Sequence, residues 1–276
     1  MSTLYLVATP IGNLEDLSHR ALRILKEVKL IACEDTRHTA KLLNHYKIST
    51  PTTSFFEHNK LKKIPRVIET LSSGDIALVS DAGTPGLNDP GYLLVKAAFE
   101  AGHTVSPIPG PSAPIAALVS SGLPTDKFLY LGYLPRKSGE RVKVLESIKE
   151  LPFTLIFFET PHRITDSFKD LLSVLGDRQV AVAGELTKLY EEIFRGTVSE
   201  TIEQFEKKSA RGEYTLVISG YSKDKELWAE EELISMIKSG IENNIPPSQL
   251  ARDLSQESGW PRRVIYNLIN EISNQE

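Results

Sequence analysis

The sequence predicts an α/β protein, built from two α/β domains with a cleft between them and a small C-terminal helical domain. Three observations carry this prediction. In the first half, apolar runs of strand length alternate with segments of helical periodicity, which is typical of a largely parallel sheet. Beyond residue 120 the apolar runs lie closer together, as in a mixed sheet, and a polar stretch near residues 220–226 precedes three helical segments. The predicted domains are residues 1–118, 119–222 and 223–276.

The elements of the first domain follow from this pattern. Apolar residues recur at helical spacing from Leu14 to Val28, and Ser18 is a suitable N-cap for that segment. The other expected elements are strands at 4–7, 29–32, 76–79 and 105–108, and helices near 60–71, 91–101 and 112–120.

The second domain and the tail are divided in the same way. Expected strands are 128–133, 153–158, 180–183, 191–198 and 214–219, with helices near 139–149 and 164–175. The tail predicts helices at 230–238, 248–255 and 262–272, with prolines where the second begins. A three-helix tail with basic residues at the start of its last helix resembles a helix-turn-helix, although small helical appendages are more often docking or packing modules.

Composition excludes several classes of protein. The chain has 276 residues, 41% of them apolar, and no stretch approaches the ~20 apolar residues that cross a bilayer. Its N-terminus has no charged flank or cleavage site of a secretory signal, so a cytoplasmic location without membrane attachment is expected. The single cysteine, Cys33, excludes an internal disulfide, and the histidines show no metal-binding spacing, so no metal is expected.

The net charge of −4 argues against nucleic-acid binding through overall charge. Contact with a nucleic acid must therefore be local. Basic clusters that are available for it, or that simply face solvent, are Lys60, Lys62, Lys63 and Arg66; Arg136, Lys137, Arg141 and Lys143; and Lys207, Lys208 and Arg211.

Three Gly- and Pro-rich loops follow apolar runs and are candidates for a ligand crevice. They are VATPIGN at 7–13, SDAGTPGLNDPG at 80–91 and GPSAP at 110–114. Loops at the carboxyl ends of parallel strands expose backbone polar groups, and glycine allows a ligand to approach closely. The chain lacks both GxxxxGK[ST] and GxGxxG, so a nucleoside-like ligand other than a nucleoside triphosphate or an ordinary dinucleotide is expected.

Four further segments place charged groups just past apolar runs: CEDTRHT from Cys33, LPRK from Leu134, FFETPHR from Phe157 and GELTKLYEE from Gly184. Unpaired charges are costly to bury. These groups therefore either form structural ion pairs or face a wet cleft.

Taken in this order and at these distances, the loops and the charged segments resemble the tetrapyrrole methylase superfamily, and within it the family of ribosomal RNA small subunit methyltransferase I. The resemblance covers about residues 4–222. It implies transfer of a methyl group from S-adenosyl-L-methionine to the 2′-hydroxyl of a cytidine in the decoding region of 16S rRNA. It also implies a homodimer that acts on the small ribosomal subunit without a metal.

Carried over by position, the resemblance implies two groups of cofactor-binding residues. Those on the three loops are Pro10, Asp81, Gly83, Thr84, Ser112 and Ala113. Those expected to cover the cofactor from the second domain are Phe157 or Phe158, Ala183 and Thr215.

The chemistry of the reaction selects further candidates. A ribose hydroxyl is a poor nucleophile while protonated, so a nearby base, or a lysine that favours the alkoxide, would assist. The candidates for this catalytic role are Glu185, Lys188, Glu159 and Asp35, with Glu185 and Lys188 preferred. Candidates for RNA contact are Arg37, His38, Tyr133, Arg136, His162 and Arg163, because RNA bases are gripped on aromatic or guanidinium planes.

Two alternatives remain open. A tetrapyrrole C-methyltransferase would share the cofactor site but would need an apolar, macrocycle-sized trough, against which the charged segments argue. A non-catalytic RNA-binding module would bind RNA without turnover.

Overall fold

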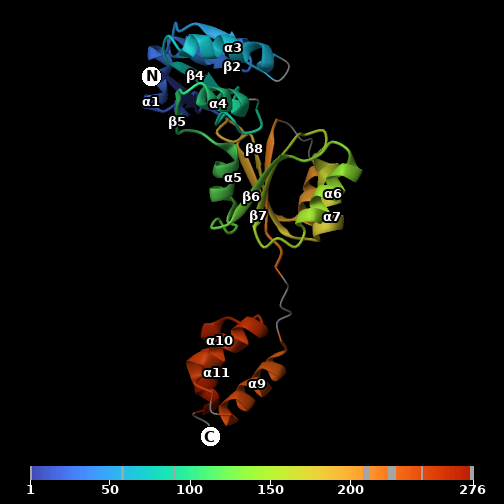
Figure 1. Ribbon diagram of the computed structural model, residues 1–276. Helices are drawn as coiled ribbons and strands as arrows, with labels where there is room; N and C mark the ends of the chain where they lie inside the picture. Colours follow the sequence, from blue (N-terminus) through green and yellow to red (C-terminus); the bar gives the residue numbers. More distant parts are fainter. Residues whose placement is uncertain are drawn as a thin grey trace. The chain divides into compact units, whose positions relative to one another are not determined.

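The computed structural model describes residues 2–56, 59–89, 91–207, 212–222, 228–243 and 245–273. The chain divides into two compact units, residues 1–220 and 221–276 (Figure 1). The larger unit contains both sheets. Lys208 and Arg211 of the third basic cluster, and Pro90 of the second loop, lie outside the described residues.

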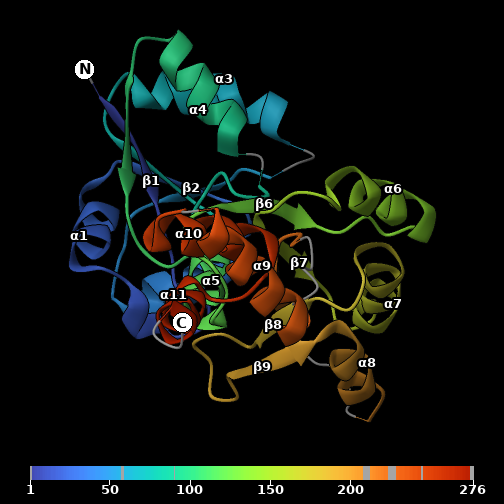
Figure 2. The same cartoon turned by 90° about the horizontal axis from the view of Figure 1, so that it is seen from below.

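The first sheet is parallel throughout, in the order β3-β2-β4-β1-β5. Its strands are β1 (Thr3–Val7), β2 (Leu30–Cys33), β3 (Thr52–Ser54), β4 (Ile76–Val79) and β5 (Thr104–Ile108). The accompanying helices are η1 (Leu14–Asp16), α1 (His19–Glu27), α2 (Thr36–His45), α3 (Lys60–Leu71) and α4 (Gly91–Glu100). One face packs against α1 and α2 and the other against α3 and α4, which lie together in Figure 2.

The strand order places the loop crevice of this sheet. β1 and β4 are neighbours at the centre of the sheet. After β1 the chain continues to β2 and β3, which lie on the β4 side, whereas after β4 it crosses to β5, which lies on the β1 side. In an open α/β sheet, ligands bind outside the carboxyl ends of the strands at such a reversal of order. The loops after β1 and β4, which begin at Ala8 and Ser80, therefore flank the crevice.

The second sheet is mixed, in the order β6-β7-β10-β8-β9, and only β6 and β7 are parallel. Its strands are β6 (Phe128–Tyr133), β7 (Thr154–Glu159), β8 (Gln179–Gly184), β9 (Glu192–Thr197) and β10 (Tyr214–Ile218). The helices are α5 (Ala113–Ser121), α6 (Ser138–Ile148), α7 (Ile164–Leu175) and α8 (Val198–Lys207). α5 covers one face, whereas α6, α7 and α8 cover the other.

The C-terminal unit consists of α9 (Glu230–Glu242), α10 (Pro247–Glu257) and α11 (Arg262–Ser273). It has its own apolar core, in which Leu233, Ile237, Ile265 and Ile269 are fully buried. Among the described residues, no helix is long and apolar enough to cross a membrane.

The predicted α/β class, the largely parallel first sheet and the mixed second sheet are confirmed. Ser18 caps α1 by accepting from the backbone N–H of Ala21, as expected. Three elements were not predicted: α2, the three-residue strand β3 and α8. Both helices do carry apolar residues at helical spacing, Leu42, Leu43 and Tyr46 at α2 and Val198, Ile202 and Phe205 in α8, but each is only about three turns long. β3 is an edge strand too short to show a period.

Candidate functional site

A cavity of about 330 Å³ lies between the two sheets of the larger unit. Ligand pockets typically run from about 300 to 1,000 Å³, so this one suits a small molecule. The first half contributes Ile11, Glu34, Ser80, Asp81, Ala82, Gly83, Thr84, Leu87, Asn88, Asp89, Ser112, Ala113 and Pro114. The second half contributes Tyr133, Phe158, Ala183, Glu185, Leu186, Lys188, Glu213, Tyr214 and Thr215.

The loops of the first half brace one another at the cavity. Gly83 and Thr9 exchange two backbone hydrogen bonds, at 2.9 and 3.0 Å, which join the loops after β4 and β1. The hydroxyl of Thr84 donates to the carbonyl oxygen of Pro111 at 3.1 Å and so joins the second loop to the third. Gly83 has φ +79°, a conformation that favours glycine. The wall is therefore largely preformed.

The second sheet presents one row of side chains to the cavity. Tyr133 pairs with Phe158 across β6 and β7, and Thr215 pairs with both Phe158 and Ala183. All four residues line the cavity. Because neighbouring residues of a strand point to opposite faces, Phe157 lies instead in the core between the sheet and α7, with no exposed surface.

Carboxylates dominate the charge of the cavity wall. Lys188 is the one Lys or Arg among the described residues that line it, whereas Glu34, Asp81, Asp89, Glu185 and Glu213 are acidic. Burial, followed by the neighbouring carboxylates of Asp81 and Asp89, raises the pKa of Glu34. Burial also raises the pKa of Asp89, against the lowering effect of hydrogen bonds from the backbone N–H groups of Gly91 and Gly86. The wall is therefore suited to a cationic ligand.

The connection between β8 and β9 carries the preferred catalytic pair. The Lys188 ammonium donates to Glu185 Oε1 at 2.8 Å, and both side chains are partly exposed. Glu185 and Thr187 have φ values of +50° and +63°, which are uncommon for residues other than glycine. The backbone N–H of Asn13 donates to Thr187 Oγ1 at 3.0 Å, so this connection is also joined to the first loop.

Most of the predicted cofactor-binding residues lie together on the cavity wall. These are Asp81, Gly83, Thr84, Ser112, Ala113, Phe158, Ala183 and Thr215. Pro10 is not on the wall, but its neighbour Ile11 is. Of the predicted alternatives Phe157 and Phe158, the wall contains Phe158.

The four catalytic candidates are not brought together. Glu185 and Lys188 line the cavity, whereas Glu159 and Asp35 do not. Glu159 is fully buried and accepts hydrogen bonds from Arg163 and Ser167. Asp35 caps α2, and hydrogen bonds from the Arg37 side chain and backbone lower its pKa to about 2.

The candidates for RNA contact occupy three places. Tyr133 is 46% exposed at the cavity, and Arg136 and His162 are exposed on the loops after β6 and β7. Arg37 and His38 are exposed on α2, where Arg37 pairs with Asp35 at 2.8 Å. Arg163 is mostly buried, and its guanidinium is paired with Glu159.

Sequence reasoning missed several residues of the wall, among them Glu34, Asn88, Glu213 and Tyr214. Glu34 lies in the motif CEDTRHT, directly before the predicted Asp35. An aspartate before Thr-Arg-His-Thr is a typical N-cap, and this signal would have assigned Asp35 to the helix and left Glu34 for the cavity. Among the described residues there is no cluster of three or more His, Cys, Asp and Glu side chains that could hold a metal ion.

Comparison with known proteins gives one family. The family model for tetrapyrrole (corrin/porphyrin) methylases matches residues 3–202. The chain is 46% identical to a ribosomal RNA small subunit methyltransferase I of Synechocystis sp. over 275 residues, which cover 99% of each chain. It is 44% identical to the protein of that name from Halalkalibacterium halodurans (98% of this chain, 95% of the relative) and 43% identical to that from Bacillus subtilis (97% and 94%).

Solved structures show the same fold at low sequence identity. A diphthine synthase superposes with a TM-score of 0.63 at 15% identity, over 79% of this chain and 90% of the other. A uroporphyrin-III C-methyltransferase from Thermus thermophilus superposes with a TM-score of 0.56 at 19% identity, over 79% and 94%. At these identities the comparison supports the fold alone.

Proposed function

The chain belongs to the tetrapyrrole methylase family and, within it, to the family of ribosomal RNA small subunit methyltransferase I, and from this we propose that it methylates small-subunit rRNA. The reaction we propose is transfer of the methyl group of S-adenosylmethionine to the ribose 2′-hydroxyl of a cytidine in the decoding region. The observation that carries the proposal is the acidic cavity, in which residues from both sheets meet the Glu185–Lys188 pair.

The residues of the cavity fit S-adenosylmethionine. When bound, this cofactor supplies a methyl group on a positively charged sulfonium, which is already activated for transfer. Glu34, Asp81 and Asp89 favour a cation over a neutral ligand, and Phe158 with Tyr133 offers apolar surface for an adenine ring. Asp81 Oδ1 also accepts from the backbone N–H of Asp35 at 2.9 Å, which orients its carboxylate.

The protein's part in the chemistry is alignment and proton transfer. Holding donor and acceptor in line can account for roughly 7 kcal/mol or more of a barrier. We assign Glu185 as the group that accepts the proton of the 2′-hydroxyl, with the Lys188 ammonium stabilising the developing alkoxide. Their 2.8 Å contact lets one pair perform both tasks. Asp35 and Glu159 are held in other contacts, so the pair is the stronger candidate.

Exposed groups beside the cavity are suited to an RNA acceptor. Tyr133 offers a ring on which an unstacked base can lie, Arg136 provides positive charge on the loop after β6, and His162 offers an exposed ring on the loop after β7. Arg37 and His38 provide a second exposed basic group on the first half. Because the first 224 residues contain equal numbers of acidic and basic residues, such local groups have to provide the attraction.

The first experiment incubates the protein with tritiated S-adenosylmethionine and small ribosomal subunits that lack the modification, and identifies the labelled nucleoside by mass spectrometry after nuclease digestion. We expect 2′-O-methylcytidine. Label on a base would contradict the assigned acceptor. RNA binding without label would support a non-catalytic module, and methylation of a tetrapyrrole alone would support the small-molecule alternative.

Two variants separate cofactor binding from transfer. Asp81→Asn keeps an acceptor for the Asp35 N–H but loses the charge, so we expect weaker cofactor binding by calorimetry. Lys188→Ala should leave the cofactor affinity unchanged and lower kcat by about 10²-fold. Equal turnover by Lys188→Ala and the wild type would contradict the role assigned to Lys188.

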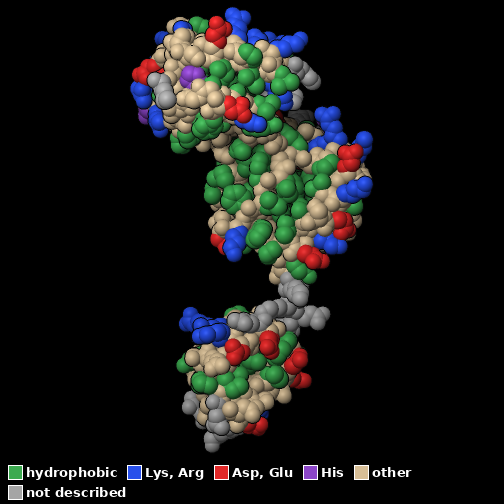
Figure 3. Space-filling view, viewed as in Figure 1, with side chains coloured by type: hydrophobic (Ala, Val, Ile, Leu, Met, Phe, Trp, Pro, Cys, Tyr) green, Lys and Arg blue, Asp and Glu red, His purple; other side chains and the backbone are tan. Residues whose placement is uncertain are grey.

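We also propose a homodimer, which an exposed apolar face supports. Figure 3 shows hydrophobic side chains gathered over α5 and the adjoining part of the second sheet. On this helix Ile115 and Val119 are 45% and 68% exposed. Large exposed apolar patches mark interaction sites. Sedimentation analysis of the wild type and of Val119→Glu tests this, and an unchanged oligomeric state in the variant would contradict the assigned face.

A further inference from the structure

The loop at residues 134–137 leaves β6 directly after Tyr133, which lines the cavity. It carries the start of the basic cluster that the sequence groups together. The structure divides this cluster: Arg141 is buried, whereas Arg136, Lys137 and Lys143 are exposed. The buried arginine therefore has a different role from its neighbours.

Arg141 holds this loop from the α6 side. Its Nε donates to Asp170 Oδ2 at 2.7 Å, and its Nη1 donates to the carbonyl oxygens of Pro135 and Arg136 at 3.1 and 3.3 Å. The side chain is 4% exposed, and that of Asp170 is 18% exposed. Asp170 also accepts from the hydroxyl of Ser138, the first residue of α6, at 3.1 Å, so it also holds the start of the helix that follows the loop.

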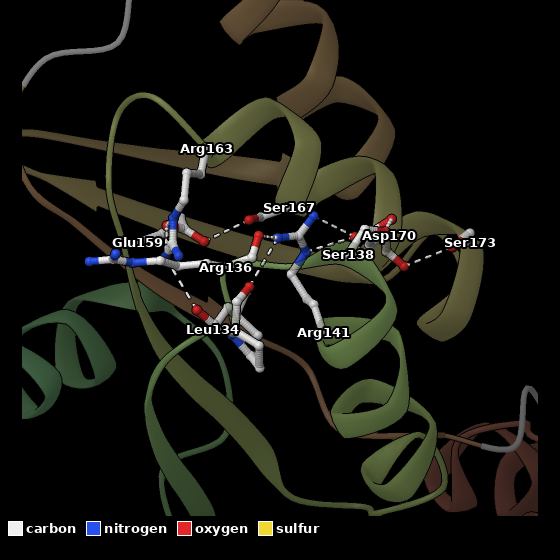
Figure 4. A network of polar contacts seen from close by, with 10 residues as sticks. Leu134, Arg136, Ser138, Arg141, Glu159, Arg163, Ser167, Asp170 and Ser173 are labelled. Carbon is white, nitrogen blue, oxygen red and sulfur yellow. Dashed lines mark hydrogen bonds and ion pairs between the residues drawn. The ribbon is translucent and has the colours of Figure 1, made fainter.

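Arg163 holds the same loop from the β7 side. Its Nε donates to Glu159 Oε1 at 2.9 Å, while its Nη2 donates both to that oxygen and to the carbonyl oxygen of Leu134, the latter at 3.2 Å. Glu159 has no exposed surface, and its second oxygen accepts from Ser167 at 2.6 Å. In Figure 4 the two ion pairs lie on either side of the loop.

Burying charge in this way is expensive unless every group is paired. Here both guanidinium groups also donate to backbone carbonyl oxygens of the loop. Arg163 donates to Leu134, and Arg141 donates to the next two residues, Pro135 and Arg136. A lysine at either position could still form the ion pair. It could not donate to the carboxylate and to the loop carbonyls together, as the several N–H groups of a guanidinium do. The consequence is a fixed backbone beneath two exposed cations, Arg136 and Lys137, of which Lys137 also forms an exposed ion pair with Glu140 at 3.2 Å.

We propose that Arg141 and Arg163 are positioning residues that fix the loop so that the Arg136 and Lys137 side chains bind a phosphate of the acceptor RNA beside the cavity. The inference rests on the proposed function, because it takes RNA as the acceptor. A guanidinium matches two phosphate oxygens, and its geometry depends on the backbone that carries it. Arg136 lies three residues after Tyr133, which lines the cavity, so this phosphate contact would position the acceptor nucleotide next to the cavity.

The chain contains a matched control. Arg178 also donates to backbone carbonyls, those of Leu175 at 3.0 Å, Ser219 at 3.3 Å and Lys149. Ser219 follows the carboxyl end of β10, whereas the amino end of β10 carries the cavity residues Tyr214 and Thr215. Arg178 therefore also holds backbone carbonyl groups in place, but at the end of the second sheet opposite the cavity.

The test is a double-mutant cycle in full-length protein. Arg141→Lys, Arg163→Lys and the control Arg178→Lys are each combined with Arg136→Gln. For every variant kcat and KM for small ribosomal subunits, cofactor affinity by calorimetry and Tm are measured. We expect Arg136→Gln to raise KM roughly tenfold with little change in kcat. The slope of log affinity for the subunit against log salt concentration should become shallower by about one, as expected for the loss of one phosphate contact.

Arg141→Lys and Arg163→Lys should raise KM to a similar degree, with unchanged cofactor affinity. In the Arg136→Gln background the same substitutions should add less than about twofold, because they act through Arg136. Arg178→Lys should lower Tm comparably and leave KM unchanged.

Three results would overturn the inference: a wild-type KM in Arg141→Lys and Arg163→Lys, full additivity with Arg136→Gln, or an equal rise of KM in Arg178→Lys. A wild-type protein that methylates no small subunits would instead contradict the proposed function, and this inference with it.

Discussion

Glu34 lines the cavity, although the sequence pattern predicts no role for it. It is adjacent to Asp35, yet Glu34 lines the cavity while Asp35 caps α2 and pairs with Arg37. Glu34 thus contributes negative charge to the cavity, whereas Asp35 stabilises the start of α2. This contrast supplies a matched pair of substitutions.

We predict that Glu34→Gln weakens binding of S-adenosylmethionine by roughly tenfold, about 1.4 kcal/mol, because a negative charge beside the cationic ligand is lost. Asp35→Asn retains a good N-cap and should leave the affinity unchanged. Titration calorimetry of both variants checks this. Equal affinities in wild type and Glu34→Gln would show that the charge of Glu34 does not contribute.

The raised pKa of Glu34 predicts a pH dependence. Burial and the Asp81 and Asp89 carboxylates favour its protonated form, so it loses its charge at a higher pH than an ordinary glutamate as the solution is acidified. On acidification, affinity for the cofactor should therefore begin to fall at a pH above the usual titration range of a glutamate, and should fall less steeply in Glu34→Gln. By the same linkage, ionised Glu34 destabilises the folded state above its pKa, so the variant should have a Tm at pH 7 no lower than that of the wild type. Parallel pH profiles of the two proteins would contradict this.

At the scale of elements, the irregular end of β6 sets the position of Tyr133. The pairing of β6 with β7 shifts register between Tyr130 and Tyr133, and Gly132 has φ +66°. A Cβ at Gly132 would lie 2.5 Å from the Asn88 side chain, which itself lines the cavity. The bulge therefore brings the second sheet against the loop after β4.

We predict that Gly132→Ala weakens cofactor binding, because the new methyl group displaces Asn88 and the strained backbone shifts Tyr133. Gly122→Ala is the control: Gly122 has φ +81° but nothing within 4 Å of the added Cβ. Both variants should lose about 1–2 kcal/mol of stability from the left-handed backbone. Only Gly132→Ala should also lose affinity in calorimetry, and equal affinities in the two variants would refute the contact.

At the scale of the whole molecule, the two compact units have separate cores. Both tryptophans of the chain, Trp228 and Trp260, belong to the C-terminal unit. Trp260 Nε1 donates to the carbonyl oxygen of Trp228 at 2.9 Å, so their environment depends on the folding of this unit. Tryptophan fluorescence, excited beyond the absorption of tyrosine, therefore reports on the C-terminal unit alone.

We predict two transitions in urea denaturation. A smaller unit buries a smaller fraction of its surface, so tryptophan fluorescence should change at lower urea than the main loss of far-ultraviolet circular dichroism. Saturating S-adenosylmethionine should raise the midpoint of the second transition only, since its proposed site lies in the larger unit. Coincident transitions that shift together would show that the units unfold as one.

The sequence by itself determined the α/β class, the order of most elements and the loops that line the cavity, because these follow from local periodicity and from the residue types that turns require. It also carried the family, through motifs such as EDTRHT and SDAGTPG. The tertiary structure alone decided which of two adjacent residues faces the cavity, as at Phe157 and Phe158 or Glu34 and Asp35. It also turned Glu159 and Arg163 into a buried pair beneath a loop. These outcomes depend on strand register and on contacts between residues distant in sequence, which no local pattern specifies.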